Sequence, residues 1–297
     1  MEKIDFFSQF EDGMPIALGF QTLMDFFSST DGYRVQKTLR RPCLFQGHGI
    51  HSGARTQIQL IPCEPNTGIV FLKKEGQQSF KIPAHFEYVT STSLATSLSL
   101  KDVPESRVAT VEHLLAALFA LGINNLLIEV QGPEIPILDG SALPFVEGIL
   151  DAGIEFQEYS SKILRILKPI KVYEHGAICE LLPRKQLRLT TSIDFNHPKI
   201  GAQTFAMDLT PRAFADQIGC ARTFGFLSDL EKLKSRNLAL GASLDNVLGF
   251  SDKDILNSDG MRFSDECVRH KWLDALGDLA LCGSWVEGEL VSFRGGH

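Results

Sequence analysis

The residues most able to carry chemistry are histidines and carboxylates at two places in the chain. His270, Asp274 and Asp278 follow one another at intervals of four, so on a helix their side chains lie along one face. A histidine and an aspartate at this spacing can donate two ligands to one metal ion. Earlier in the chain, His113 follows Glu112 at the start of an apolar run. The two segments together suggest a metal-dependent reaction.

Two histidines and one aspartate would make a ligand set typical of catalytic zinc, which leaves a fourth position for water. Zinc lowers the pKa of that water to about 7, and a neighbouring carboxylate such as Glu112 could then accept its proton. The alternative is an exposed helical face on which the same side chains form ordinary ion pairs. The Glu-His dipeptide recurs at 174–175, so the pattern leaves both interpretations open. The chain contains no His-Glu-x-x-His motif, which argues against a zinc protease of that class.

Three other segments combine polar residues with glycines or aromatic rings. Residues 47–53, Gly-His-Gly-Ile-His-Ser-Gly, could form a turn that admits a ligand close to the backbone, or a plain hairpin. Residues 221–226, Ala-Arg-Thr-Phe-Gly-Phe, place the hydroxyl of Thr223 beside two aromatic rings, a pattern that most often marks a strand end. Residues 138–141, Leu-Asp-Gly-Ser, predict a structural turn that caps a helix.

Hydrophobic periodicity predicts the elements that must position these residues. Strands are predicted at 56–61, 68–72, 126–130, 163–172 and 187–195. Helices are predicted at 111–121, 144–152, 228–235 and 265–282. Ser106 or Thr110 could cap the first helix, and Gly122 would end it. Because this helix buries an apolar face, His113 lies beside the core, where an imidazole without a partner would cost free energy.

The order of these elements indicates the fold class. Helices interrupt runs of strands rather than alternating strictly with them, which favours an α+β fold over a doubly wound parallel sheet. A length of 297 residues suits two domains. We predict an N-terminal extension at 1–36, with helical pieces around 6–10 and 20–27. A first α+β domain at 37–160 and a second at 161–297 would then join near the polar stretch 158–162.

Composition excludes several classes of protein. Hydrophobic residues make up 44% of the chain and charged residues 22%, the balance of a globular protein with a sizeable core. The net charge of −7 and the pI near 5.6 argue against a nucleic-acid binder, although a local cationic pocket could still take a small anion. No apolar run approaches the roughly 18 residues of a membrane span, so we expect no stable membrane insertion. The cysteines form no Cys-x-x-Cys pair and the acidic start lacks export-signal features, so we expect a cytoplasmic protein.

Six blocks follow one another between residue 37 and the end of the chain. They are residues 47–53, Thr-Val-Glu-His-Leu at 110–114, Glu-Ile-Pro-Ile-Leu-Asp-Gly-Ser at 134–141, Asp-Phe-Asn-His-Pro at 194–198, residues 221–226, and Val-Arg-His-Lys-Trp-Leu-Asp-Ala-Leu-Gly-Asp at 268–278. Together these blocks resemble the UDP-3-O-acyl-N-acetylglucosamine deacetylase family, zinc amidases that commit Gram-negative bacteria to lipid A synthesis. Six blocks in one order are far more specific than any single motif.

The resemblance implies a fold and a reaction. The fold would be two similar α+β domains, each a sheet layered with two helices, with the helices packed together between the sheets and small insertions forming the site. The reaction would be hydrolysis of the acetamide of UDP-3-O-(3-hydroxyacyl)-N-acetylglucosamine, which gives the free amine and acetate. The implied cofactor is Zn2+. The implied partner is this small acylated UDP-amino sugar, acted on by a monomer.

The resemblance also assigns roles in the reaction to individual residues. His113, His270 and Asp274 would bind the zinc, and Glu112 would be the general base. Thr223 would donate a hydrogen bond to the oxyanion that forms on the acetamide. These assignments add roles to the ligand set that the spacing alone suggests.

The remaining implied roles concern the leaving amine and the substrate. His297, held near Asp278, would be the general acid that protonates the amine. The residues implied to contact the substrate are Lys271, Phe224, Asp194 and Phe195. Residues 223–250 would line an apolar passage for the acyl chain.

The sequence departs from the family pattern at three places. That pattern begins near Lys37, so residues 1–36 have no counterpart in it. Ala177 stands where the family tends to carry a basic residue aimed at the substrate phosphates, so Lys271, Arg184 or another cation would take that role. The pattern also continues past the Gly-His pair to a final helix, which we expect the second domain to lack because the sequence ends at His297. A free carboxylate beside the imidazole would raise its pKa.

Two other functions stay open on the sequence alone. The intact metal-binding and base residues favour the enzyme, whereas Ala177 and the end at His297 favour a catalytically impaired homologue. Such a homologue would bind the acylated sugar nucleotide or a partner. A weaker alternative is a zinc hydrolase with an altered substrate.

Overall fold

The structure is a computed structural model that describes residues 31–297. The segments 6–10 and 20–27, where we predict helical pieces, lie outside the described residues. Asp31–Arg34 form a short 3-10 helix, η2, which leads directly into β1 (Val35–Leu39). Tyr33 is buried, and its hydroxyl donates a hydrogen bond to the carbonyl oxygen of Ala120 at 2.6 Å. Tyr33, in the last part of the predicted extension, therefore packs against the first half of the chain.

The first half of the chain builds a five-stranded sheet with the order β2-β3-β9-β4-β5. Its strands are β2 (Cys43–His48), β3 (Arg55–Pro62), β4 (Ile69–Glu75), β5 (Gln78–Pro83) and β9 (Leu126–Gln131). Neighbouring strands are antiparallel except β9 and β4, which are parallel. Along β3, Ile58 and Leu60 are fully buried while Gln57 and Gln59 on the other face are not, which is the alternation that predicted this strand.

The second half of the chain builds another five-stranded sheet, with the order β12-β13-β19-β14-β15. Its strands are β12 (Ile170–Glu174), β13 (Ala177–Leu182), β14 (Arg188–Phe195), β15 (Gly201–Asp208) and β19 (Glu289–Phe293). Only β14 and β19 are parallel neighbours. In each sheet the last strand in sequence inserts between the second and the third. The two sheets thus share one strand order and one set of directions.

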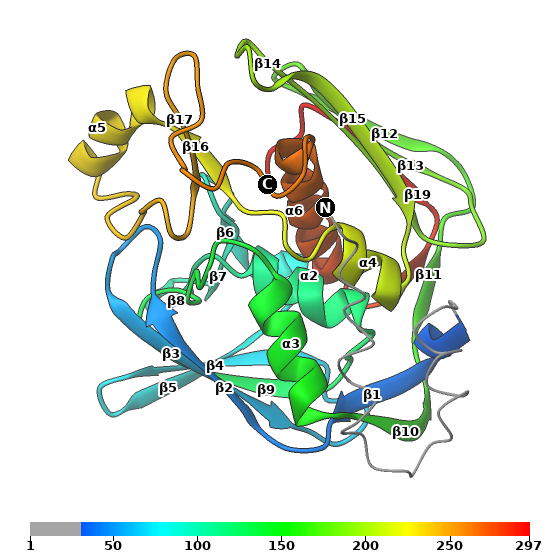
Figure 1. The fold of residues 1–297 in the computed structure, drawn as a ribbon. Coiled ribbons are helices and arrows are strands. Elements are labelled where there is room, and N and C mark those ends of the chain that lie inside the picture. The colour runs from blue at the N-terminus through cyan, green and yellow to red at the C-terminus, as the bar shows by residue number, and fades with distance from the viewer. Residues whose placement is uncertain (1–30) are drawn as a thin grey trace.

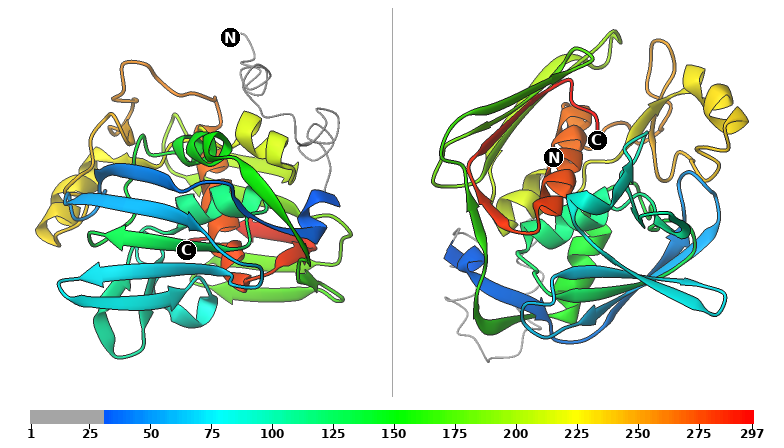
Figure 2. Two further views of the ribbon diagram at one scale, coloured as in Figure 1. Left: turned by 90° about the horizontal axis from the view of Figure 1, so that it is seen from below. Right: turned by 180° about the vertical axis from the view of Figure 1, so that it is seen from behind.

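Four helices occupy the space between the two sheets (Figure 1, and from two further directions in Figure 2). They are α2 (Glu112–Ala120), α3 (Leu143–Ala152), α4 (Pro211–Gln217) and α6 (Glu266–Leu279). The two helices α2 and α6, one from each half, pack directly against each other. This arrangement confirms the α+β fold with helices layered between two similar sheets.

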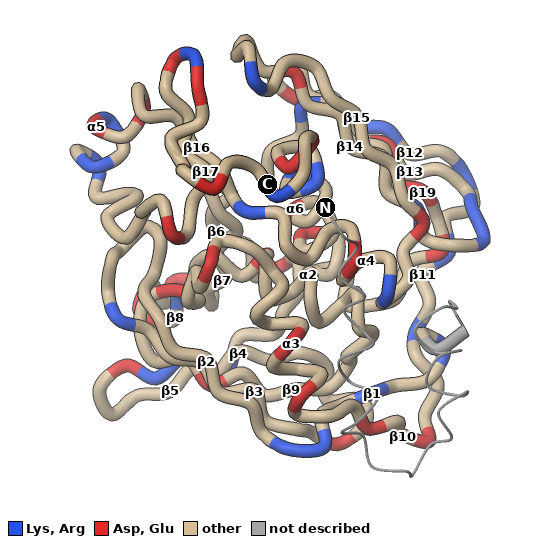
Figure 3. The backbone as a smooth tube through the Cα atoms, viewed as in Figure 1, with Lys and Arg blue, Asp and Glu red and all other residues tan. Residues whose placement is uncertain are grey.

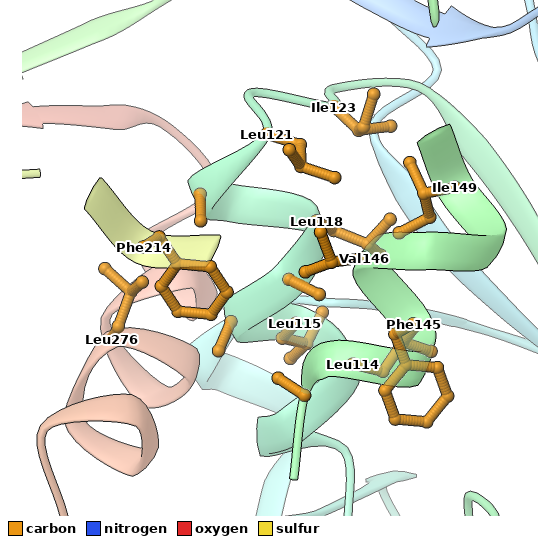
Figure 4. Close-up of a cluster of buried hydrophobic side chains, with 14 of the residues drawn as sticks. Leu114, Leu115, Leu118, Leu121, Ile123, Phe145, Val146, Ile149, Phe214 and Leu276 are labelled. Atoms are coloured by element: carbon orange, nitrogen blue, oxygen red, sulfur yellow. The ribbon is translucent and has the colours of Figure 1, made fainter. Parts of the chain in front are cut away.

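The core explains why α2 lies at the centre of the molecule. Its residues are buried on every side apart from Phe119, as expected of a helix that is apolar all round. Figure 4 shows Leu114, Leu115 and Leu118 of α2 packed with Phe145 and with Phe214, which come from α3 and α4. Gly122 follows with a φ of 68°, so it ends the helix as predicted.

Each half also carries a small insertion. In the first half, β6 (Val89–Ser91), β7 (Ser97–Leu100) and β8 (Val103–Val108) form a three-stranded sheet after the short 3-10 helix η3 (Phe86–Tyr88). In the second half, β16 (Phe224–Phe226) and β17 (Leu248–Phe250) pair in parallel and enclose α5 (Leu227–Ser235). Both insertions lie on the same side of the helices (Figure 1).

The junction of the two halves differs from the prediction of one strand at 163–172. The segment splits into β11 (Ile163–Arg165), which pairs with β18 (Trp285–Glu287), and β12, which joins the second sheet. Pro169, just before β12, has no N–H to continue a ladder. Before the junction, β10 (Ile154–Ser160) pairs with β1, and after α6 a 3-10 turn, η4 (Ala280–Cys282), leads to β18.

Charge is spread over the molecule rather than gathered on one face. Acidic and basic positions are interspersed along the described chain, as Figure 3 shows. Among the described helices, none combines the length and the apolar character that crossing a bilayer requires.

Candidate active site

The first turn of α2 carries Glu112 and His113, both buried. We predicted that Ser106 or Thr110 caps this helix, and that prediction is wrong. Ser106 lies within β8, and the hydroxyl of Thr110 instead donates a hydrogen bond to Glu134 at 2.9 Å. Thr110 also has a φ of 59°, a strained value for a β-branched residue. Its contact with Glu134 therefore fixes the point at which the chain enters the helix.

The facing helix, α6, carries the predicted row of polar residues. His270, Asp274 and Asp278 follow at one-turn intervals, and the first two are buried. The two helices lie close together at Gly277, where a Cβ atom would overlap the carbonyl group of Glu112. A glycine at this position lets the backbones approach closely enough for residues of α2 and α6 to share one site.

His113, His270 and Asp274 come together as the spacing predicted. Their ligand atoms all lie within 4.8 Å of one another. The Oδ1 atom of Asp274 is 3.2 Å from Nε2 of His270 and 3.6 Å from Nε2 of His113, yet it is buried and has no hydrogen-bond partner. A metal ion would supply the missing partner, so these residues fit one. The exposed ion-pair face that we kept as an alternative does not occur, because all three side chains are buried.

The surroundings hold these side chains in the forms that bind metals. Nδ1 of His270 lies 3.0 Å from the carbonyl oxygen of Ala221, so it carries the proton and leaves Nε2 free. Burial lowers the pKa of His113 despite its contact with Asp274, which favours the neutral imidazole. Burial would raise the pKa of Asp274, but His270 and Lys271 together lower it well below its usual range.

Glu112 lies beside this cluster as a buried carboxyl group. One of its oxygens, Oε2, accepts a hydrogen bond from the backbone N–H of Thr96 at 3.0 Å. Burial raises the pKa of Glu112 to about 8, opposed by His297 and reinforced by the carboxylates of Asp274 and Asp278. A carboxyl group tuned to this range can exchange a proton near neutral pH.

Asp278 lies between His297 and Thr96 and bonds one of them with each carboxylate oxygen. Its Nδ1 is 3.1 Å from Oδ2 of Asp278, while the hydroxyl of Thr96 donates to Oδ1 at 2.5 Å. Burial alone would lower the pKa of His297, but the bond to Asp278 and the charges of Asp274 and Glu112 raise it to about 9. The imidazole is therefore protonated at neutral pH, as a general acid must be.

The predicted substrate residues lie at several distances from this cluster. The ring of Phe224 is 6.4 Å from the ring of His270 and 5.4 Å from that of Phe195. Thr223, next to Phe224, is half-buried, and its backbone bonds join Gly140 to β17. Nζ of Lys271 is 2.8 Å from Asp274. Asp194 is exposed and forms an ion pair with Arg294.

Apolar side chains extend the site into the second insertion. The rings of Phe224, Phe226 and Phe250 pack together with Phe195 at the end of β14. Ile193 and Val268 complete the same buried cluster. An apolar cluster therefore lies beside His270, within the segment 223–250 where we predict a passage for the acyl chain.

The glycine-rich segment at 47–53 forms the hairpin turn between β2 and β3, which confirms one of the two alternatives that we proposed, and it has a further contact. The backbone N–H groups of Leu240 and Gly241 donate to the carbonyl oxygens of His51 and Ile50, each at 3.0 Å, so the turn docks the second insertion. A Cβ at position 49 would overlap the carboxylate of Glu134. The turn therefore joins the first half of the chain to the insertion of the second half.

Sequence reasoning missed three residues of this region. Thr96 lies in a stretch rich in Ser and Thr, where no pattern distinguishes it. Glu134 receives bonds from Thr110 and from the backbone and hydroxyl of Ser52, and only its place between two apolar segments hinted at burial. Of the three, only Arg294 could have been found from the sequence, because it is a cation three residues before His297.

Comparisons with known proteins match this geometry to one family. The family model for UDP-3-O-acyl N-acetylglycosamine deacetylase matches residues 36–297. A deacetylase of that name from Histophilus somni (strain 129Pt) is 46% identical over 264 residues, which cover 88% of this chain and 86% of the relative. One from Myxococcus xanthus (strain DK1622) is 47% identical over 262 residues, 88% of this chain and 82% of the relative. One from Brucella melitensis biotype 2 (strain ATCC 23457) is 45% identical over 263 residues, which cover 88% of this chain and 91% of the relative. This chain belongs to the UDP-3-O-acyl N-acetylglycosamine deacetylase family.

Proposed function

We propose that this protein is a zinc-dependent deacetylase acting on UDP-3-O-(3-hydroxyacyl)-N-acetylglucosamine. It hydrolyses the acetamide to the free amine and acetate, the committed step of lipid A biosynthesis. The observation that carries the proposal is the buried cluster of His113, His270 and Asp274 with a carboxyl group and an imidazole beside it. Relatives that share almost half of its residues bear this deacetylase name.

His113, His270 and Asp274 would hold the metal. Two imidazole nitrogens and one carboxylate oxygen are the donors of catalytic zinc sites, which keep one position open. When bound, zinc would lower the pKa of water and polarise the acetamide carbonyl. A cation there would also favour the ionised form of Glu112, against the burial that raises its pKa.

Two side chains beside the cluster of His113, His270 and Asp274 would carry out the proton transfers, Glu112 as base and His297 as acid. Glu112 would take the proton of the attacking water, and Thr223 would donate a hydrogen bond to the oxygen on which negative charge develops. His297 would give its proton to the nitrogen as the C–N bond breaks, since an amine leaves more readily than its anion. Asp278, bonded to Nδ1, would keep the other ring nitrogen available for that transfer.

Substrate binding would use the surfaces around the cluster. The aromatic residues Phe195, Phe224 and Phe226 would receive the acyl chain, because they form an apolar wall beside His270. Lys271 follows His270 directly and Arg294 lies three residues before His297, and both cations would attract the diphosphate. Asp194 would set the position of Arg294 through their ion pair.

Arg184 does not suit the phosphate role that we considered for it. It precedes β14, whereas Phe195 ends that strand, and eight extended residues separate the two by about 25 Å. Its guanidinium pairs with Asp208 at 2.9 Å. Arg184 therefore would not substitute for the basic residue that the family tends to carry at the position of Ala177. The substrate phosphates would depend on the cations near His297.

The catalytically impaired homologue gains no support. The ligand set, the base and the acid lie together, and the carboxylate of Asp278 already fixes the imidazole of His297. We further propose that the protein works in the cytoplasm as a monomer, with no stable membrane insertion, on a small-molecule substrate.

The deciding experiment measures release of free amine from UDP-3-O-(3-hydroxyacyl)-N-acetylglucosamine, with metal content determined on the same sample. We expect turnover that disappears with a chelator and returns with zinc. Turnover of other acetamides without this one would favour the altered-substrate hydrolase. Bound zinc with no turnover of any acetamide would contradict the deacetylase.

The ligand assignment has its own test. His270→Ala and Asp274→Ala should each lower bound metal to a small fraction of the wild-type value, because each removes one of three donors. His197→Ala is the matched control, since His197 is also buried but bonds Ser251 at 2.8 Å, outside the ligand cluster. Full metal occupancy in both ligand variants would refute the assignment.

A further inference from the structure

Thr96 connects the two proton-transfer sides of the site. It lies in the first insertion, just before β7, and only 1% of its surface is exposed. Its backbone N–H donates to Oε2 of Glu112 at 3.0 Å, and its hydroxyl donates to Oδ1 of Asp278 at 2.5 Å. Its carbonyl oxygen accepts from the N–H of Val111, the residue just before α2, at 3.3 Å.

These three bonds reach two helices that belong to different halves of the chain. Glu112 comes from the first turn of α2 and Asp278 from the last turns of α6. Asp278 uses its second oxygen, Oδ2, to bond His297 at 3.1 Å. One residue of the insertion therefore contacts the carboxyl group on the base side and the carboxylate that holds the acid.

We propose that Thr96 is a positioning residue that sets the relative placement of Glu112 and the Asp278–His297 pair. The inference rests on the proposed deacetylase function, and it assigns this role to an insertion residue that bonds Glu112 and Asp278 rather than the proposed metal ligands. Its side chain acts on the acid through Asp278, and its backbone acts on the base directly.

The geometry explains why a hydroxyl is needed at this place. Asp278 has two carboxylate oxygens in a largely enclosed setting, and each has one donor, Thr96 for Oδ1 and His297 for Oδ2. Without the hydroxyl, the carboxylate can rotate to recover a partner for Oδ1, and the imidazole turns with it. A shift of about 1 Å in a reacting group can cost a hundredfold in rate.

The neighbouring chain restricts Thr96 to this orientation. Leu94, two residues earlier, has a φ of 66°, and Ala95 between them is buried. The chain thus turns at Leu94, and the two residues after it, Ala95 and Thr96, are both buried. The insertion thus presents Thr96 to both helices at once.

The test compares two substitutions at this position with a control in the same insertion. Thr96→Val keeps the shape and the backbone bonds but removes the hydroxyl, and Thr96→Ser restores it. Ser99→Ala is the control, because Ser99 has a buried hydroxyl that bonds only within the insertion, to Leu100, Val103 and Ser106.

We expect Thr96→Val to lower kcat about tenfold to a hundredfold while KM stays within about twofold of wild type. Thr96→Ser should regain most of the loss, and Ser99→Ala should leave kcat unchanged. Metal content should be equal in all four proteins. Wild-type kcat in Thr96→Val, no recovery in Thr96→Ser, or an equal loss in Ser99→Ala would overturn the proposal.

A second measurement does not depend on turnover. The imidazole 15N shifts of His297 report its bond to Asp278, and they should change in Thr96→Val but not in Thr96→Ser or Ser99→Ala. Unchanged shifts in Thr96→Val would overturn the positioning role. A wild-type protein that shows these shifts but releases no amine would instead contradict the proposed function.

Discussion

Glu112 is buried and lies one residue before His113, which we propose as a metal ligand. We expect Glu112→Gln to retain its metal, because the amide is nearly isosteric and Glu112 is not in the ligand cluster. Turnover should fall by a factor of about 10² to 10⁴, the usual contribution of a general base. Metal analysis and single-substrate kinetics on one preparation provide the check. An unchanged kcat would remove Glu112 from the mechanism.

The pH dependence of turnover should report His297. As general acid it must be protonated, and its pKa is raised to about 9, so kcat/KM should fall as the pH rises through about 9. Asp278→Asn removes the carboxylate that raises this pKa, so the alkaline limb should move to lower pH. Rate profiles of both proteins between about pH 6 and pH 10 make the comparison. An alkaline limb at the same pH in both would show that His297 is not the acid.

The sequence predicted which side chains lie together when they share one helix. It did not predict contacts between side chains on different elements. The spacing of His270, Asp274 and Asp278 forces them onto one face of α6, so the sequence alone suggested a metal site. Thr96 and Glu134 act through bonds to residues distant in sequence. No local pattern encodes such contacts, since a buried Thr in a Ser-rich segment has the same sequence appearance as an exposed one.

At the scale of elements, the approach of α2 and α6 depends on Gly277. Gly277→Ala would place a methyl group against the carbonyl of Glu112, which is backbone and cannot rotate away. We expect the helices to separate, so that metal affinity falls about tenfold or more and the melting temperature drops by several degrees. Metal titration and thermal unfolding test this expectation.

A glycine in another helix serves as the control for that prediction. Gly148 in α3 is also closely packed, but a Cβ there would meet the ring of Phe45, away from the site. Gly148→Ala should therefore lower stability without changing metal affinity. If Gly277→Ala bound metal as tightly as wild type, the helix contact would not set the geometry of the site.

Helices and strands with a clear hydrophobic periodicity were predicted well. Elements whose limits depend on tertiary contacts were not. The helices at 111–121 and 265–282 and the strand at 187–195 appear close to their predicted limits. The strand predicted at 163–172 divides between two sheets, because β11 finds a partner only in β18, more than a hundred residues away. Helix α4 was missed since its seven residues are too few for a helical period to emerge.

At the scale of the whole molecule, one buried cation weakens the fold. Lys37 is fully buried against Tyr33 and Phe156 at the far end of α2 from the site, and burial lowers its pKa to about 7. The unfolded chain binds this proton up to about pH 10.4, so stability should rise as the pH rises from 7 to that value. Below pH 7 both states are protonated and the cost of burial is constant.

Lys37→Met should therefore raise the free energy of unfolding at pH 6 by on the order of a few kcal/mol, and should flatten its rise above pH 7. Turnover should not change. Lys81→Met, at an exposed position of β5, is the control and should alter neither quantity. Chemical denaturation at several pH values measures the effect. A less stable Lys37→Met would mean that the contacts of the ammonium outweigh its desolvation.

The shared strand order of the two sheets has a consequence for the history of the enzyme. Each sheet is interrupted between its fourth and fifth strands in sequence, and α2 and α6 occupy those equivalent intervals. Gene duplication and fusion of a half-length ancestor would produce this repetition. In such an ancestor two identical helices would have met across a twofold axis. Divergence would then explain why one copy now carries one proposed metal ligand and the proposed base, whereas the other carries two proposed ligands and the partner of the proposed acid.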